Sequence, residues 1–507
     1  MKTQNIPNIP AEKFKFASTE GRLHDTKLDT KPVSYFQDAF RRFCRNKSSV
    51  VAAVIILILV LYSIFVPLFC ENNYTRALTD TDYLQYGKLR PKSSLFAWAG
   101  WDGCSNLDIA NQYEYQYYNA IGIETGLNPI AKIKKTWEED GKPYYSLRID
   151  TYYNLGMRYL TLSPADYQAI QDWQDETGIQ VIFPAVDTTA FTVQSFKNDA
   201  NRWYQLDSKG RPVVQDGQLI PLYVTTGEDD YVSSLRIASD DGTYRYALPA
   251  GSSTSPSWKI RVSQYNYFQY KYGFEPSFLF GTTALGQDIF TRLAKGAQFS
   301  FLLAIFVSAI NLVIGSIYGA IEGYYGGTAD LIMERVSDVL GGIPFMVATA
   351  LFQLHLAKVV GPVVSLMFAF VLTGWIGMAS RVRMQFYRFK NSEYVLSSRT
   401  LGARDWRVMF KHIFPNSLGT IITGSILVIP GVIFSESSLT YLGIVNLDSS
   451  TMTSVGTMLG NAKDYLTSDP HIIFFPALFI ALLEISFNLF GNGLRDAFNP
   501  SLRGSED

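Results

Sequence analysis

Two carboxylates, Glu436 and Glu484, stand inside otherwise apolar stretches of the sequence. A charged side chain is unfavourable in a hydrocarbon environment, so such a carboxylate is a functional candidate. If the two face a central pathway, they can bind the amino group of a passing solute. The alternative is a structural carboxylate that pairs with neighbouring hydroxyls or amides, such as Ser435, Ser437 or Asn488. Both interpretations stay open.

A charged segment at residues 391–416 lies between two long apolar stretches. Its apolar residues recur at helical spacing and form one stripe, which comprises Trp406, Met409, Phe410, Ile413 and Phe414, while Arg404, Arg407 and Lys411 lie off it. Asn391 or Ser392 can cap a first helix. Gly402 permits a sharp turn, and Pro415 is expected to close a second helix. The pattern predicts a docking element, with a surface helix in the lipid headgroups as the alternative.

Motifs for catalysis and metal binding are absent from the sequence. There is no G-x-x-x-x-G-K-[ST] phosphate loop, no HExxH and no paired-cysteine zinc spacing, and the four histidines are scattered. We therefore expect no catalytic residue, metal or cofactor on this chain, and any nucleotide hydrolysis must come from a separate subunit. The net charge of −1 argues against a nucleic-acid partner.

The distribution of apolar residues divides the 507-residue chain into a membrane part and a polar part. Six apolar runs approach or exceed the ~20 residues that a helix needs to cross a bilayer. They lie at about 49–69, 298–321, 338–357, 360–380, 418–444 and 472–491. Gly341, Gly342 and Pro344 interrupt the third run. Pro430, followed by Gly431, gives the fifth run a kink or hinge, unless it only improves packing.

Lysine and arginine residues near the apolar runs set the orientation. Four precede the first run, and eight fill the segment between the fourth and fifth runs. Because positive charge favours the cytoplasmic side, both termini and residues 391–416 are expected inside. The predicted fold is mainly α, with six transmembrane helices. Its parts are a cytoplasmic tail at 1–48, a first transmembrane helix at 49–70, an extracellular insert at 71–277 and a five-helix core at 278–507.

The insert at 71–277 is too long for a connecting loop and is expected to fold as an α+β domain. Ser163 and Gly178 bound a predicted helix, and Asp216-Gly217 and Asp241-Gly242 are typical of hairpins.

Aromatic and cysteine residues in and near the insert support further hypotheses. The aromatic run just before the second apolar run is typical of a membrane interface, with core filling as the alternative; it comprises Tyr265, Tyr267, Phe268, Tyr270 and Tyr272. Cys70 and Cys104 can form a disulfide if both lie outside the cell.

The segment at 391–416 resembles the cytoplasmic coupling loop of ABC importer permeases, through Glu393, Gly402, Ile413 and Pro415. Ser397 and Ser398 replace the usual alanine pair of that loop. Three further stretches resemble the oligopeptide/dipeptide (peptide/nickel) branch of the family: FGTTALGQDIFTRLAKGAQFS at 280–300, GYYGGTADLIMERVSDVLGGIP at 323–344 and FNLFGNGLRDAFNPSLRG at 487–504. The sequence departs from the family at Thr283, Gln287 and Asn492. The resemblance covers residues 33–70 and 278–504 and leaves the insert outside.

The resemblance implies a transmembrane permease subunit of a binding-protein-dependent importer of oligopeptides or dipeptides in a bacterial cell membrane. It implies a second homologous permease subunit, two ABC ATPases that use ATP and Mg²⁺, an extracellular peptide-binding lipoprotein, a peptide substrate and membrane lipid as partners. The implied coupling residues are Glu393, Ser397, Ser398, Gly402, Ala403, Arg404, Trp406, Arg407, Phe410 and Pro415; the pathway candidates are Glu436, Glu484 and Pro430. The alternatives are an importer of nickel or another small solute from the same family, and a membrane-anchored extracellular adhesion or enzyme domain.

Overall fold

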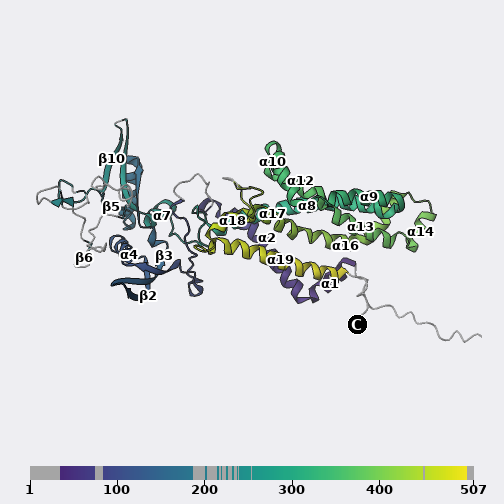
Figure 1. Ribbon diagram of the computed structural model, residues 1–507, viewed down its shortest axis with the longest axis horizontal. Coiled ribbons are helices and arrows are strands. Elements are labelled where there is room, and N and C mark those ends of the chain that lie inside the picture. Colours follow the sequence, from purple (N-terminus) through teal and green to yellow (C-terminus); the bar gives the residue numbers. More distant parts are fainter. Residues whose placement is uncertain are drawn as a thin grey trace, which may run out of the picture.

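The computed structural model is an elongated molecule with helices along most of its length and β-sheets at one end (Figure 1). It describes residues 35–74, 84–186, 200–201, 214–215, 218–219, 224–225, 231–232, 237, 239–252, 254–448 and 452–498. The helical elements, in chain order, are α1 Tyr35–Arg45, α2 Lys47–Tyr74, α4 Gln112–Thr125, α5 Pro164–Thr177, α7 Gln264–Tyr272, α8 Ile289–Tyr325, α9 Gly327–Gly341, α10 Phe345–His355, α11 Ala357–Val360, α12 Pro362–Gly374, α13 Ile376–Phe389, α14 Glu393–Thr400, α15 Asp405–Arg407, a π-helical segment Val408–Ile413, α16 Phe414–Ile426, α17 Val428–Tyr441, α18 Val455–Ala462 and α19 His471–Phe498.

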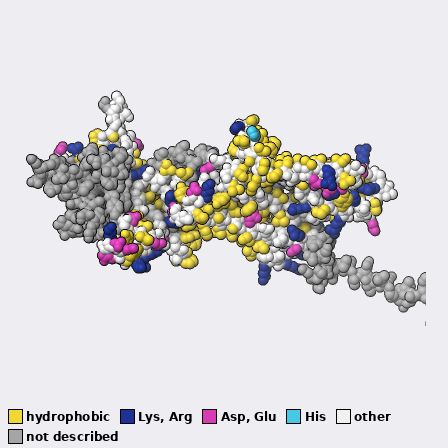
Figure 2. Space-filling view, viewed as in Figure 1, with side chains coloured by type: hydrophobic (Ala, Val, Ile, Leu, Met, Phe, Trp, Pro, Cys, Tyr) yellow, Lys and Arg dark blue, Asp and Glu magenta, His cyan; other side chains and the backbone are white. Residues whose placement is uncertain are grey.

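Several of these helices are long and apolar enough to cross a membrane. Within the described residues, five such runs occur, at Lys47–Cys70, Ile289–Tyr325, Pro362–Phe389, Asp405–Tyr441 and His471–Phe498. Each contains most or all of one of the predicted apolar runs. Hydrophobic side chains cover the surface over these helices in Figure 2. The chain is therefore a mainly helical, multi-pass membrane protein.

The third predicted span, at 338–357, is not one straight helix. α9 and α10 meet at an angle of 69°, so a sixth span exists only if this bent pair is counted as one. Pro344 immediately precedes α10. Proline has no amide hydrogen to donate, and it disfavours helical geometry in the residue before it. The bend lies at Gly341, Gly342 and Pro344, the residues that interrupt the predicted apolar run.

α8 and α13 pack closely along a row of glycines. Gly315, Gly319 and Gly323 recur every four residues and so share one face of α8. A Cβ on Gly319 would lie 2.1 Å from the carbonyl oxygen of Ala379, and one on Gly323 would lie 2.7 Å from the carbonyl oxygen of Arg383. Small residues at this spacing let two helix backbones approach inside a membrane. The contact holds the charged end of α13 beside the end of α8.

α16 and α17 are separated by a break at Leu427, three residues before Pro430. Proline cannot donate the backbone hydrogen bond to the residue four positions earlier, so the regular ladder is interrupted there. A neighbouring helix supplies another donor nearby, because Arg381 Nη1 donates to the Gly424 carbonyl at 2.9 Å. The structure thus has a discontinuity where the sequence predicted a kink.

The β-rich end contains two sheets of three or more strands among the described residues. β1 Cys104–Asn111, β3 Lys142–Asp150 and β2 Ile130–Glu139 are antiparallel in the order β1-β3-β2. β10 Ala247–Ser252, β11 Ser255–Ser263 and β4 Met157–Leu162 form the second sheet, and β5 Ile182–Phe183 also pairs with β11. Two short pairs are β6 Val214–Gln215 with β7 Gln218–Leu219, and β8 Val224–Thr225 with β9 Tyr231–Val232.

Turn signals in this region are confirmed where the structure describes them. Ser163 caps α5, and Gly178, with a φ of 72°, ends it. Gly242 has a φ of 85°, in a turn where Ser239 N donates to the Thr243 carbonyl at 2.6 Å. The predicted turn residues Asp216-Gly217 lie outside the described residues, although the flanking strands β6 and β7 pair.

Three of the five rings in the aromatic run of α7 are buried within the chain, and those of Tyr270 and Tyr272 are half-buried. Phe268 is fully buried, and Tyr265 and Tyr267 are buried as well. The ring of Phe268 packs edge-on against that of Tyr86, with centroids 5.1 Å apart. α7 also packs against β11. Core filling, which was the alternative interpretation, is therefore right for these three rings.

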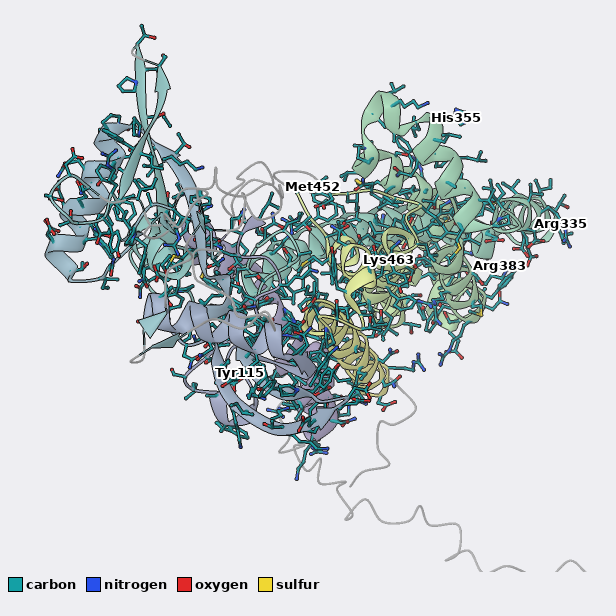
Figure 3. All side chains as sticks on the ribbon, turned by 60° about the vertical axis from the view of Figure 1, so that its left-hand side comes forward. Tyr115, Arg335, His355, Arg383, Met452 and Lys463 are labelled. Carbon is teal, nitrogen blue, oxygen red and sulfur yellow. The ribbon has the colours of Figure 1, made fainter. Side chains whose placement is uncertain are left out.

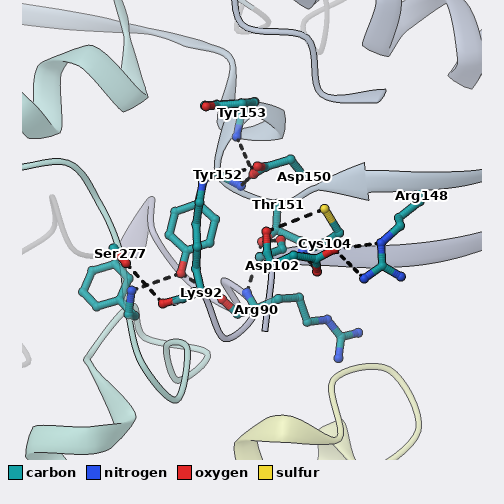
Figure 4. Close-up of polar contacts among 12 residues, drawn as sticks. Arg90, Lys92, Asp102, Cys104, Arg148, Asp150, Thr151, Tyr152, Tyr153 and Ser277 are labelled. Atoms are coloured by element: carbon teal, nitrogen blue, oxygen red, sulfur yellow. Dashed lines mark hydrogen bonds and ion pairs between the residues drawn. The ribbon is translucent and has the colours of Figure 1, made fainter. Parts of the chain in front are cut away.

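The segment Tyr86–Lys92 joins the sheets to the helices. The Arg90 guanidinium donates to the Ser468 carbonyl at 2.8 Å and lies 3.5 Å from Asp469, just before α19. On the other side, Tyr152 Oη, next to the end of β3, donates to the Arg90 carbonyl at 2.8 Å (Figure 4). Hydrogen bonds to both parts therefore fix the sheets against the adjacent end of the helical part.

Cys70 and Cys104 do not form a disulfide. The three cysteines of the chain all lie in the described residues and are free. Cys104 Sγ donates to the Asp102 carbonyl at 3.7 Å, beside the ion pair of Asp102 with Arg148 (Figure 4). Burial raises the pKa of the Cys104 thiol to about 11, and the Asp102 carboxylate adds to this shift. The thiol stays protonated at neutral pH, which makes it a poor nucleophile.

Candidate functional site

The first half of the predicted docking loop has the expected helix and turn. α14 starts directly after Ser392, whose hydroxyl donates to the Phe389 carbonyl at 2.6 Å instead of capping the helix. Gly402 has a φ of 80°, a conformation that favours glycine. Gly402 N donates to the Arg399 carbonyl at 2.9 Å, and Ala403 N donates to that of Ser398 at 3.1 Å. This bond pattern closes the end of a helix around a left-handed residue.

The second half of the loop differs from the prediction. Pro415 does not close a helix; it lies in the first turn of α16, which follows α15 and the π-helical segment without a break. A proline ring clashes with the carbonyl four residues earlier in a regular α-helix. The wider π-helical turn just before it accommodates such a position. The loop therefore runs directly into the span that ends at Tyr441.

Most of the predicted apolar stripe is buried within the chain. Met409 is 2% exposed and Ile413 is fully buried, in a cluster with Val382 and Phe386 of α13. Phe410 and Phe414 pack against the same cluster. The expectation that the whole stripe faces a partner was wrong, because a helical period shows that residues share a face but not what covers that face.

A different part of the loop is left exposed. Leu401 is 88% exposed and Trp406 is 63% exposed, on either side of the Gly402 turn. Further exposed residues that the sequence had marked for coupling are Glu393, Ser397, Arg404, Arg407 and Pro415, whereas Ser398, Ala403 and Phe410 are half-buried. In Figure 1, α14 lies at the end of the molecule opposite the sheets. We call Leu401, Gly402 and Trp406 the loop tip.

Polar contacts fix the base of the loop to α8. Tyr324 Oη donates to Asp405 Oδ1 at 2.6 Å, and the Arg399 guanidinium lies over the Tyr324 ring, 4.8 Å from its centroid. Val395 of α14 is fully buried against the same helices. The base of the loop is therefore packed against α8 and α13.

An ionic cluster around Arg383 was not predicted. The guanidinium of Arg383, which is labelled in Figure 3, donates to Asp330 at 2.6 and 2.9 Å and to Glu334 at 2.9 and 3.1 Å. Glu322 lies 3.6 Å away, and Tyr387 Oη also donates to Asp330. The cluster ties α8, α9 and α13 together. In the sequence, Arg383 is one of several basic residues between the fourth and fifth apolar runs. The only sign of an ion pair is that Glu322, Asp330 and Glu334 precede it on two other helices.

Glu436 matches the structural alternative. It is fully buried, and its carboxylate accepts hydrogen bonds from Ser300 Oγ at 3.0 Å and Thr440 Oγ1 at 3.1 Å. These partners are hydroxyls, as expected, but neither is a serine next to it in sequence. Among the described residues, the Glu436 side chain is not exposed to solvent.

Glu484 is more accessible. It lines an apolar groove of about 810 Å³ together with Phe434, Leu442 and Ile485. Its Oε1 atom has no hydrogen-bond partner among the described residues. Asn488 Nδ2 donates to the Glu484 backbone carbonyl at 2.9 Å, so this amide does not pair with the carboxylate. Of the two carboxylates, only Glu484 lines this groove.

The break at Leu427 borders a smaller cavity. The cavity has a volume of about 260 Å³, and Asn311, Thr373 and Gly431 line it. Asn311 is 3% exposed, and its Oδ1 atom has no partner within the described part of the chain. A buried amide oxygen without a partner is rare, and water or a polar solute can satisfy it. The sequence analysis missed Asn311, for which a lone amide in an apolar run was the available signal.

Comparison with known proteins identifies the family. The model described as binding-protein-dependent transport system inner membrane component matches residues 312–504, and that of the N-terminal TM domain of oligopeptide transport permease C matches residues 34–91. The oligopeptide transport system permease protein of Bacillus subtilis is 42% identical over 224 residues, which cover 44% of this chain and 72% of that protein. This chain belongs to the oligopeptide/dipeptide permease family.

Two further similarities accompany these matches. The dipeptide transport system permease protein of Bacillus subtilis is 40% identical over 225 residues, which cover 44% of this chain and 69% of that protein. A solved chain of the MetNI methionine ABC transporter, in an inward-facing conformation, covers 41% of this chain and 96% of that chain at 13% identity, with a TM-score of 0.35. At that score the overlay supports no argument about the fold.

The N-terminal family match extends beyond the first predicted span. The N-terminal permease model continues to residue 91, past the end of the first transmembrane helix that the sequence analysis placed at 70. The segment Tyr86–Lys92, which joins the sheets to the helices, is therefore almost entirely within the family-wide part. Neither model matches residues 92–311, which include the two larger sheets.

Proposed function

We propose that this chain is one of two unlike transmembrane subunits of an ATP-driven importer of oligopeptides or dipeptides. The observation that carries the proposal is the 42% identity to an oligopeptide permease subunit across 72% of its length. The partners would be a second homologous permease subunit, two ABC ATPases that use ATP and Mg²⁺, and an extracellular peptide-binding lipoprotein. This chain is not an enzyme and binds no cofactor itself.

The proposed topology has six spans in a bacterial cell membrane, with α9 and α10 counted as one bent span. Both termini and the loop at 391–416 are cytoplasmic, and the α+β insert between the first and second spans is extracellular. Two observations support this topology. Basic residues precede α2 and fill the loop, and the loop and the sheets lie at opposite ends of the molecule in Figure 1.

The proposed mechanism is alternating access, in which the loop tip couples the ATPases to the spans. Leu401 and Trp406 would seat in an apolar groove of an ATPase, while neighbouring arginines fix the register by charge complementarity. The base of the loop is buried against α8 and α13, so closure of the ATPases would move these helices together. The break at Leu427 gives α17 a point at which to change its angle.

The proposed pathway residues are Glu484 and Asn311. A carboxylate in an apolar groove can bind the amino group of a peptide, and an unpartnered amide oxygen can accept from its backbone. Glu436 is left out of this set because hydroxyls already satisfy it and it is fully buried.

Co-purification tests the proposal. A tagged copy of the chain, extracted from native membranes in mild detergent and analysed by mass spectrometry, should bring down two ABC ATPases, a homologous permease and a peptide-binding protein. Peptide, and not nickel, should then stimulate ATP hydrolysis by the purified complex. Purification of the chain without any ABC ATPase would contradict the proposal and support the adhesion or enzyme alternative. Stimulation by nickel alone would support the small-solute alternative.

A further inference from the structure

A small apolar loop stands out on the surface beside the outer ends of the membrane helices. The loop runs from Ser93 to Trp101 and contains a 3-10 turn at Ala97–Ala99. Trp98 is 85% exposed and Leu95 is 71% exposed. Exposed aromatic and aliphatic side chains gathered in one short loop are a sign of an interaction surface.

The loop is closed by its own hydrogen bonds. Ser93 N donates to the Trp101 carbonyl at 2.8 Å, and Trp101 N donates to the Phe96 carbonyl at 3.3 Å. Gly100 has a φ of 91°, which allows the chain to turn back after the 3-10 turn. The exposed side chains are therefore presented by a defined backbone.

Aromatic contacts place the base of this loop against a membrane helix. The Trp101 ring packs edge-on against Phe475 and Phe280, with centroids 5.7 and 5.9 Å away. Phe475 lies in the second turn of α19, which begins at His471. The loop therefore lies level with the end of a span, not at the far tip of the sheets.

The apolar surface continues from the loop onto the spans. On α19, Phe474 is 54% exposed and Leu478 is 41% exposed. On α2, Tyr62 packs against Phe479 with centroids 6.3 Å apart, so the two helices lie side by side here. The loop packs on α19 through Trp101, so it extends this apolar surface beyond the helix end.

We propose that the loop Ser93–Trp101 is a lipid anchor, in which Leu95 and Trp98 enter the headgroup region of the outer leaflet. Tryptophan favours that region because its ring is apolar and its indole N–H can meet water or lipid oxygen. The polar base remains outside, where Lys92 Nζ binds Asp150 at 3.3 Å. The inference uses the extracellular placement proposed above, but it does not depend on the transported solute.

Depth-dependent quenching tests the anchor. In the full chain carrying Cys44→Ser, Cys70→Ser and Cys104→Ser, Trp98→Cys or Leu95→Cys would be labelled with an environment-sensitive fluorophore. The protein would then be placed in nanodiscs whose phospholipid carries a nitroxide at the headgroup. Both labels should lose emission strongly. A label at Lys134→Cys, an exposed position on β2, is the matched control and should keep its emission.

The outcomes separate lipid from protein as the occupant. Equal emission at Trp98→Cys, Leu95→Cys and Lys134→Cys would overturn the anchor. Shielding of the two loop labels from an aqueous quencher by an added peptide-binding protein, without quenching by lipid, would assign the loop to a protein partner and also overturn it. Nanodiscs that hold this chain alone make the result independent of the importer proposal.

Discussion

Replacing Gly319 by leucine should prevent the membrane helices from forming a stable core. A Cβ at this position would lie 2.1 Å from the Ala379 carbonyl oxygen and 2.8 Å from its carbonyl carbon. Both atoms belong to the backbone, so no flexible side chain can move aside, and α8 must separate from α13. Overpacking costs typically 1–3 kcal/mol, and we expect a loss of about 3 kcal/mol or more here because a helix–helix contact is opened.

The control for this substitution lies on the partner helix. Gly377→Leu places the same side chain on α13, where an added Cβ would meet nothing within 4 Å among the described atoms. Thermal unfolding in detergent, followed by size-exclusion chromatography, should show a lower midpoint and aggregation for Gly319→Leu and little change for Gly377→Leu. Similar stability of the two variants would contradict the close packing of α8 on α13.

Arg383→Ala should destabilise the chain by ~3 kcal/mol, because it leaves acids close together without their cation. Glu322 and Asp330 have side chains only 5% and 10% exposed. Arg383→Lys should recover part of the loss, since an ammonium cannot bind Asp330 and Glu334 as a planar guanidinium does. Chemical denaturation monitored by circular dichroism would measure both differences.

An exposed ion pair nearby provides the comparison for Arg383. Arg335 pairs with Asp338 at 2.8 Å, but the side chains are 75% and 56% exposed. Such pairs contribute ~0–1 kcal/mol, so Arg335→Ala should leave the unfolding curve almost unchanged. Adding Asp330→Asn to Arg383→Ala should restore stability in part. If the double variant is no more stable than Arg383→Ala alone, repulsion between the acids is not the cause of the lost stability.

Local patterns predicted the shape of the docking loop but not its orientation. Gly402 could be placed in a turn from sequence because few residues other than glycine adopt a positive φ readily. Met409 and Ile413 are buried by residues of α13, a helix that is separated from them in sequence by α14 and the turn at Gly402. A period of 3.6 residues does not show whether an apolar stripe packs against its own chain or against a partner protein. The stripe was expected to contact a partner, but most of it packs against α13.

The environment of each carboxylate also depended on distant residues. The hydroxyl of Ser300, which donates to Glu436, comes from a different span 136 positions earlier. No spacing rule links these two residues. The aromatic residues show the same limit, because the run in α7 fills a core while Trp98, one of several tryptophans in the insert, is exposed beside α19. Spans and turns were predictable because their causes are local.

ATP-driven peptide uptake by loop-tip variants tests the central claim most directly. Proteoliposomes that contain the whole complex would be loaded with ATP, and the peptide-binding protein and labelled peptide would be added outside. The double variant Leu401→Asp, Trp406→Asp should abolish uptake, because two charges cannot seat in an apolar groove. Ile109→Asp, at a 67% exposed position on β1, should leave uptake intact. Uptake by the double variant at the unaltered rate would contradict coupling through the loop tip.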